Sequence, residues 1–166
     1  MNSLPGETGP ARFWRLDDAR FAGTWDSGEG ARLKGGRWNP VGLPVVYCAL
    51  DPGTAILEVA VHKGFKTLNA MPHILTAAEL RVSWSLVHVV GPADVPNRLW
   101  LYPCALSGAQ QAFGRELLRE HEFVAIPSAV SRRSWTLIFD PVRSVGKYGL
   151  RDQEPLDLDP RLDPPR

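Results

Sequence analysis

Residues 44–64, PVVYCALDPGTAILEVAVHKG, predict a buried strand that passes directly into a helix. The apolar run 44–50 has the length of a strand buried on both faces. Asp51 and Pro52 then predict a helix start, because Asp favours the N-cap and Pro favours the first helical position. The helix is expected to run to about His62 and to stop at Gly64. The sequence therefore predicts a strand–helix unit at the centre of the chain.

The remaining pattern adds further strands and a second helix around this unit. Ser107-x-x-Gln110 has the form of a capping box, and the apolar spacing after it predicts a helix to about His121. The glycine-rich residues 23–43 predict a long irregular loop, a kind of segment that often carries function. Further strands are expected at 13–16, 73–80, 86–90, 123–126 and 135–139. The sum is an α+β fold with several short strands and two main helices.

Length and composition predict a single globular domain with a loose segment at each end. The chain has 166 residues, of which 44% are hydrophobic and 22% charged, values typical of one folded domain. Residues 1–10 are expected to form a flexible N-terminal arm. The domain itself is expected over 11–150. Residues 151–166 are rich in Asp, Pro and Arg and predict a flexible C-terminal tail.

Charge and cysteine content argue against several classes of protein. The net charge of +1, without a basic stripe, does not favour direct nucleic-acid binding. No apolar run is long enough to span a membrane. Cys48 and Cys104 are expected as buried free thiols, which fits a cytoplasmic protein. The four histidines lack the close pairing of a zinc site, so no metal is expected.

Four residue types in the pattern suggest a ligand site, and each also has a plainer explanation. Arg37 follows Gly35-Gly36, where the backbone can approach a phosphate closely, yet a surface loop with an exposed Arg is commoner. Glu58 stands among apolar residues on the predicted helix, facing either a cleft or solvent. Ser128 is a candidate hydrogen-bond donor or a plain turn hydroxyl. Tyr47 is either a core residue or a ring that stacks on a ligand.

These residues and their spacing resemble the RES domain family, named for Arg, Glu and Ser. The resemblance covers roughly residues 12–142. The three residues that give the family its name correspond to Arg37, Glu58 and Ser128. Two positions depart from the family pattern, because Thr136 and Asp140 stand where the family usually has Asn. The blocks that carry the resemblance are Phe13-Trp14-Arg15-Leu16, Gly35-Gly36-Arg37-Trp38-Asn39-Pro40-x-Gly42, Pro44-Val45-Val46-Tyr47, Ala55-x-Leu57-Glu58-Val59, Val61-His62 and Pro127-Ser128-Ala129-Val130.

The resemblance implies an ADP-ribosyltransferase-like fold, with a split, twisted central sheet flanked by helices. It also implies the toxin of a bacterial toxin–antitoxin pair that uses NAD⁺ as substrate, by hydrolysis, by phosphorolysis or by transfer of ADP-ribose to a protein target. The expected partner is an Xre-like helix-turn-helix antitoxin that blocks the active site, and a homo-oligomer could form through that complex.

The resemblance further implies a role for each site residue. Glu58 would stabilise positive charge on the ribose, the problem that glycosidases also solve with carboxylates. Arg37 would clamp the pyrophosphate with help from Arg15. Tyr47 would stack on nicotinamide, and Ser128 would donate to phosphate or ribose. Trp38 would pack under a ring or anchor the loop.

Two questions stay open on the sequence alone. The acceptor of ADP-ribose could be water, phosphate or a protein side chain. A non-catalytic module that only binds a nucleotide or a partner in the same pocket is the alternative to an enzyme.

Overall fold

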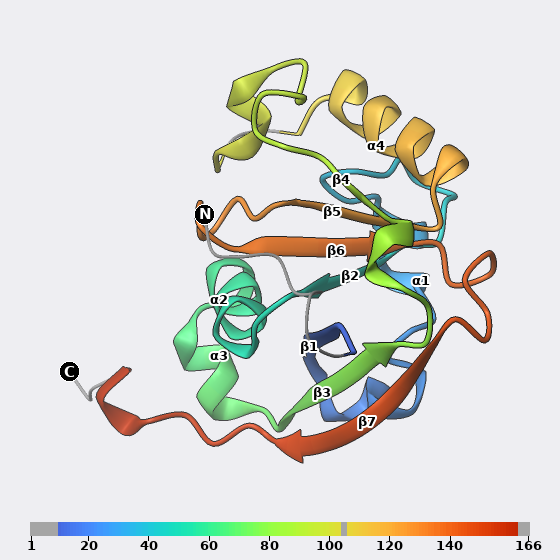
Figure 1. Cartoon of the computed structure of the whole chain (residues 1–166). Helices are drawn as coiled ribbons and strands as arrows, with labels where there is room; N and C mark the ends of the chain where they lie inside the picture. The colour runs from blue at the N-terminus through green and yellow to red at the C-terminus, as the bar shows by residue number, and fades with distance from the viewer. Residues whose placement is uncertain (1–9, 104–105, 163–166) are drawn as a thin grey trace.

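The computed structural model describes residues 10–103 and 106–162 (Figure 1). The predicted N-terminal arm lies outside the described residues except for Pro10. Cys104 and the last four residues of the predicted tail also lie outside them.

The described chain forms seven strands, four α-helices and four short 3₁₀-helices. This architecture confirms the predicted single domain of the α+β class. The strands are β1 (Arg12–Asp18), β2 (Val46–Ala49), β3 (His73–Leu80), β4 (Val87–Val89), β5 (Phe123–Pro127), β6 (Trp135–Phe139) and β7 (Tyr148–Pro155). The helices are η1 (Ala19–Thr24), α1 (Glu29–Lys34), α2 (Pro52–Lys63), α3 (Phe65–Ala70), η2 (Trp84–Leu86), η3 (Arg98–Leu101), α4 (Gly108–Glu120) and η4 (Pro160–Leu162).

The strands form one sheet in the order β4-β5-β6-β2-β1-β3-β7, and only β4 and β5 are parallel neighbours among the described strands. The sheet is narrowest in its middle, where β1 and β2 share the single pair Trp14 and Ala49. Arg15 bridges the gap beside this pair by donating to the carbonyl of Tyr47 at 2.8 Å. The sheet therefore has two halves, β4-β5-β6-β2 and β1-β3-β7, joined by a short contact (Figure 1).

Three apolar clusters hold the halves and the helices together. The largest fills the face that the two halves share, and Phe13 of β1 meets Phe139 of β6 there at a ring distance of 5.9 Å. On the other face, α4 covers the β5–β6 half and α2 with α3 covers β1 and β3. Tyr47 alternates with Val46 and Cys48 of the shared core, so its ring points to the helical face, where it packs in the cluster covered by α4.

The strand–helix unit at the centre of the chain follows the prediction closely. The Asp51 carboxylate accepts from the backbone N–H of Thr54 at 2.8 Å, and Pro52 occupies the first helical position. Helix α2 ends at Gly64, whose φ of 80° is a conformation that favours glycine. Local capping chemistry thus fixes both ends of the helix that carries Glu58.

Two segments differ from the predictions. Residues 23–43 were expected to be irregular, yet they contain α1 and the end of η1. Strand β7 carries the sheet to Pro155, past residue 150 where the predicted domain ended, by pairing with β3. Its outer face is solvent-exposed, so the strand lacks the apolar alternation that marks half-buried strands. Within the described residues, no helix is long and apolar enough to cross a membrane.

Candidate functional site

The Gly-Gly-Arg turn is packed so tightly that only glycine fits at its second position. A Cβ on Gly36 would lie 2.6 Å from Oδ1 of Asn39 and 2.7 Å from Oη of Tyr47. The backbone N–H of Gly36 donates to the carbonyl of Asn39 at 2.9 Å, and its carbonyl accepts from Nε2 of Gln111 at 3.0 Å. Strand β2 and helix α4 therefore fix the turn from two sides.

The Tyr47 hydroxyl is fully engaged in holding this turn. It accepts from the backbone N–H of Trp38 at 2.9 Å and donates to Oδ1 of the buried Asn39 at 2.7 Å. Burial raises the pKa of Tyr47 well above its ordinary value, so the hydroxyl stays protonated across the physiological range. The half-buried ring, and not the hydroxyl, is the part of Tyr47 that can contact a ligand.

Arg37 projects from the turn towards the segment around η3. Its Nη1 donates to the carbonyls of Trp100 at 3.1 Å and Tyr102 at 3.2 Å. No carboxylate among the described residues pairs with its guanidinium, whose remaining N–H groups are left for a ligand. This half-buried cation is suited to bidentate contact with phosphate oxygens.

The Glu58 carboxylate is held in place by Ser128. Ser128 Oγ donates to Oε1 of Glu58 at 2.9 Å, across 70 residues of sequence. Oγ of Ser128 also accepts from the backbone N–H groups of Val130 at 3.2 Å and Ser131 at 3.4 Å. Ser128 is only 1% exposed, so its hydroxyl is a buried support that fixes the direction of the carboxylate.

A cation–π contact joins the part of the site that holds Arg37 to the part that holds Glu58. The Arg132 guanidinium carbon lies 4.3 Å from the ring centroid of Tyr102, whose carbonyl binds Arg37. Arg132 belongs to the short β5–β6 connection that begins with Ser128. This connection lies at one end of the sheet, between α2 and the segment around η3 (Figure 1). The structure thus pairs Glu58 directly with Ser128. A chain of contacts through Tyr102 and Arg132 leads from Arg37 to the connection that holds Ser128.

The contacts of three expected site residues bear on their roles. Trp38 is 2% exposed and packs against Phe113 of α4 at a ring distance of 6.2 Å, which favours anchoring of the loop, one of the two roles expected for it. The buried hydroxyl of Ser128 donates to Glu58.

The third of these residues is Arg15, whose guanidinium is bound to other groups of the protein. It forms two hydrogen bonds with the Asp17 carboxylate, at 2.8 and 2.9 Å, besides its bond to the Tyr47 carbonyl. It alternates with Trp14 and Leu16 of the helical face and so lies on the shared-core face with Phe13. Arg15 therefore stabilises the join between the halves of the sheet and lies on the wrong face to assist Arg37.

Sequence reasoning overlooked three residues that the site uses: Asn39, Gln111 and Arg132. Asn39 stands inside the Gly-Gly-Arg-Trp-Asn-Pro motif, and this position was the available signal. Gln111 and Arg132 carry no local signal, because their partners are 75 and about 30 residues away. Arg132 and its neighbour Arg133 have the pattern of a solvated surface.

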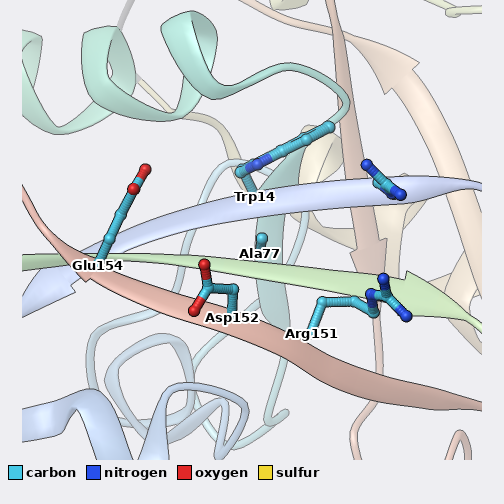
Figure 2. A pocket seen from close by; sticks show the side chains of 6 residues that line it. Trp14, Ala77, Arg151, Asp152 and Glu154 are labelled. Atoms are coloured by element: carbon cyan, nitrogen blue, oxygen red, sulfur yellow. The ribbon is translucent and has the colours of Figure 1, made fainter.

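A separate groove lies on the β1-β3-β7 half. Six residues line it, namely Arg12, Trp14, Ala77, Arg151, Asp152 and Glu154, and Figure 2 shows the last three on β7. This groove contains neither Arg37 nor Glu58 and is not part of the candidate site. In residues 10–103 and 106–162, no group of three or more His, Cys, Asp or Glu side chains is arranged to hold a metal ion.

The chain is similar to several known proteins. The family model described as RES domain matches residues 12–159. Toxin Res of Photorhabdus laumondii subsp. laumondii is 45% identical over 52 residues, which are 31% of this chain and 33% of that protein. The Prs ADP-ribosylating toxin of a Sphingobium species is 50% identical over 52 residues, 30% of this chain and 32% of that protein. The matched segment thus spans about a third of each curated relative.

A solved structure shows the same fold. One chain in the crystal structure of the M. tuberculosis MbcT–MbcA toxin–antitoxin complex superimposes with a TM-score of 0.72 and 24% identity. The superposition covers 89% of this chain and 85% of that one.

Proposed function

Because the chain belongs to the RES domain family, we propose that it is the toxin of a bacterial toxin–antitoxin pair and cleaves the bond between nicotinamide and ribose in NAD⁺. One observation carries this proposal. A carboxylate fixed by a buried serine and an arginine without a carboxylate partner among the described residues stand at the two ends of a chain of contacts that runs through Tyr102 and Arg132.

The residues present fit the chemistry of NAD⁺. The free N–H groups of Arg37 match the oxygens of the pyrophosphate, and the half-buried ring of Tyr47 offers an apolar surface for nicotinamide. Glu58 keeps one carboxylate oxygen without a hydrogen bond from the described residues, and this oxygen can face the ribose. Arg37, Tyr47 and Glu58 are the proposed catalytic residues.

The proposed reaction breaks the C–N bond so that both electrons leave with nicotinamide. Nicotinamide departs as a neutral base, and positive charge develops on the ribose. Glu58 stabilises this charge, as a fixed negative group placed where charge develops in the transition state. Water, phosphate or a protein side chain then adds to the ribose carbon. The name of the Sphingobium relative, an ADP-ribosylating toxin, supports a protein acceptor as one of these choices.

The test is release of nicotinamide from NAD⁺ by the purified protein. Glu58→Gln should lower the rate by at least about a hundredfold, because the amide cannot neutralise the developing charge. Glu116→Gln is the matched control, since Glu116 is an exposed residue of α4 that pairs with Arg119. Equal rates for wild type and Glu58→Gln would contradict the proposal. Saturable NAD⁺ binding without any release would favour the non-catalytic module.

Label on the adenine of NAD⁺ identifies the acceptor. Label on protein marks a transferase, free ADP-ribose marks hydrolysis, and ADP-ribose phosphate marks phosphorolysis. These three outcomes exclude one another as the main product.

The proposed partner is an Xre-like helix-turn-helix antitoxin that covers the site in the cytoplasm. The toxin–antitoxin complex that contains the structural neighbour supports an antitoxin partner. Nicotinamide release should stop when the protein encoded beside this chain is added. A neighbouring protein that binds without inhibiting would contradict this part of the proposal.

A further inference from the structure

Two arginines meet at Tyr102 without a carboxylate between them. Arg37 donates to the Tyr102 carbonyl at 3.2 Å, and Arg132 lies over the Tyr102 ring at 4.3 Å. The two cations come from distant segments, the glycine turn and the β5–β6 connection. Neither forms an ion pair with any described residue.

Arg37 and Arg132 differ in this respect from the arginines that bind a carboxylate within 4.0 Å, which are Arg15, Arg20, Arg32, Arg115, Arg119, Arg151 and Arg161. The partners of the Arg37 and Arg132 guanidiniums among the described residues are neutral, namely two backbone carbonyls and an aromatic ring. An anionic ligand with more than one charged oxygen would supply the negative charge that both lack and can hydrogen-bond to both forks.

We infer that Arg132 is a second pyrophosphate-binding residue, which rests on the proposed function and specifies how the dinucleotide is recognised. Arg132 takes the role that the sequence suggested for Arg15, whose guanidinium is held by Asp17 on the other face. An exposed cation–π contact is weak, so Arg132 can leave the Tyr102 ring for a phosphate at small cost. Without a bound ligand, the Arg132 guanidinium lies on the Tyr102 ring.

The inference predicts a loss of binding and not of chemistry. Arg132→Ala should raise KM for NAD⁺ about tenfold and leave kcat within about twofold, because a charged hydrogen bond to phosphate is lost. Arg133→Ala removes the same charge from the neighbouring exposed position and should leave both constants unchanged.

A substrate without a pyrophosphate separates this role from a general effect of charge. Nicotinamide mononucleotide has a single phosphate, so wild type should prefer NAD⁺ over it. Arg132→Ala should reduce this preference about tenfold, and Arg133→Ala should retain it. Inorganic pyrophosphate, used as a competitor, should inhibit wild type and Arg133→Ala more strongly than Arg132→Ala.

The outcomes are distinct. If wild type releases no nicotinamide, the proposed function fails and titration with pyrophosphate still tests Arg132 by binding alone. If wild type is active but Arg132→Ala matches Arg133→Ala in KM and in substrate preference, the inference is overturned. If Arg132→Ala lowers the melting temperature and leaves KM unchanged, Arg132 stabilises the fold without binding the substrate. That result also overturns the inference.

Discussion

Ser128 and Tyr47 both use a hydroxyl group to hold a neighbouring side chain in place. Ser128 donates to Glu58, and Tyr47 donates to Asn39, at 2.9 and 2.7 Å. A buried hydrogen bond of this kind restricts the rotamers of the side chain that accepts it. At the scale of single residues, the site is therefore built from supports that orient Glu58 and the Arg37 turn before any ligand arrives.

Ser128→Ala should impair catalysis more than it impairs folding. Without the hydroxyl donor Glu58 can rotate, and kcat for nicotinamide release should fall about tenfold. The free energy of unfolding should fall by about 2 kcal/mol, because the hydroxyl also accepts from the backbone N–H groups of Val130 and Ser131, and the protein should remain folded. Steady-state kinetics and thermal melts measure the two effects.

The control for this prediction lies in the same connection. Ser131 bonds to the hydroxyl of Ser134 at 2.9 Å and does not contact Glu58, so Ser131→Ala should keep its kcat. Ser128→Thr retains the hydroxyl and should recover part of the loss. A Ser128→Ala protein with the kcat of wild type would show that Glu58 does not depend on this bond.

At this scale, the sequence predicts residue types better than their roles. Arg37, Glu58 and Ser128 are identifiable from their motifs. The bond from Ser128 to Glu58 is not, because it joins residues 70 positions apart through a sheet register that no local pattern encodes. The pairing of Arg15 with Asp17 and with the Tyr47 carbonyl was not predicted either.

Helix α4 supports the site through close contact with the Arg37 loop. Gly114 lies where a Cβ would be 2.1 Å from the carbonyl oxygen of Trp38. Glycine weakens a helix interior, so its presence here indicates that α4 and the loop must approach closely. The same helix carries Gln111, which binds the Gly36 carbonyl.

Gly114→Ala should destabilise the protein although alanine is the better helix former. The clash is with backbone, so overpacking should cost about 3 kcal/mol and exceed the gain of about 1 kcal/mol in helix propensity. Thermal melting should therefore occur several degrees lower. Gly108→Ala in the same helix has open space around its Cβ and should be neutral or slightly stabilising. Equal melting temperatures for the two variants would contradict this close approach.

The contact between β4 and the end of α4 should weaken in acid. His88 and His121 stack with ring centroids 3.9 Å apart and an angle of 2°. Burial, and then the charge on His121, lower the pKa of His88, while Asp94 and Glu120 oppose this shift. The unfolded chain therefore binds a proton at His88 before the folded chain does. The stabilisation is complete above the ordinary histidine pKa of 6.5 and is lost as the pH falls below it.

Melting temperatures at about pH 7.5 and about pH 5.5 measure this effect. The fall between the two values should be smaller for His88→Gln than for wild type. His62→Gln, at an exposed position on α2, should retain the fall seen in wild type. An identical fall in all three proteins would show that the stacked pair does not contribute.

The helix ends were predictable because capping is local. Asp51 and Ser107 each accept from a backbone N–H three residues ahead, as their patterns indicate. Gln110, the last residue of the predicted capping box, instead donates to the carbonyl of Trp100. Helix α3 has six residues and one buried side chain, too little for a periodic signal.

The two halves of the sheet are held together mainly by the core between them. Beside the single β1–β2 pair, aromatic rings from both halves pack against one another. The rings of Tyr148, at the start of β7, and Phe139 of β6 have centroids 4.7 Å apart. Burial raises the pKa of Cys48 in this core to about 12, which keeps the thiol unreactive. The α+β class follows from local patterns, but the order of the strands depends on contacts between distant segments.

Strand β7 should therefore be essential to the fold although its sequence is polar. It covers the edge of β3 over its length, and Gln153 donates to the Ala22 carbonyl at 2.7 Å and to Thr76 at 3.0 Å. A chain that ends at Lys147 loses these bonds and the Tyr148 ring, and it should show no cooperative thermal transition. A chain that ends at Asp159 keeps β7 and should melt within a few degrees of the full-length protein. If the shorter chain melted like the longer one, the domain would end at or before Lys147, and the shared core would close without β7.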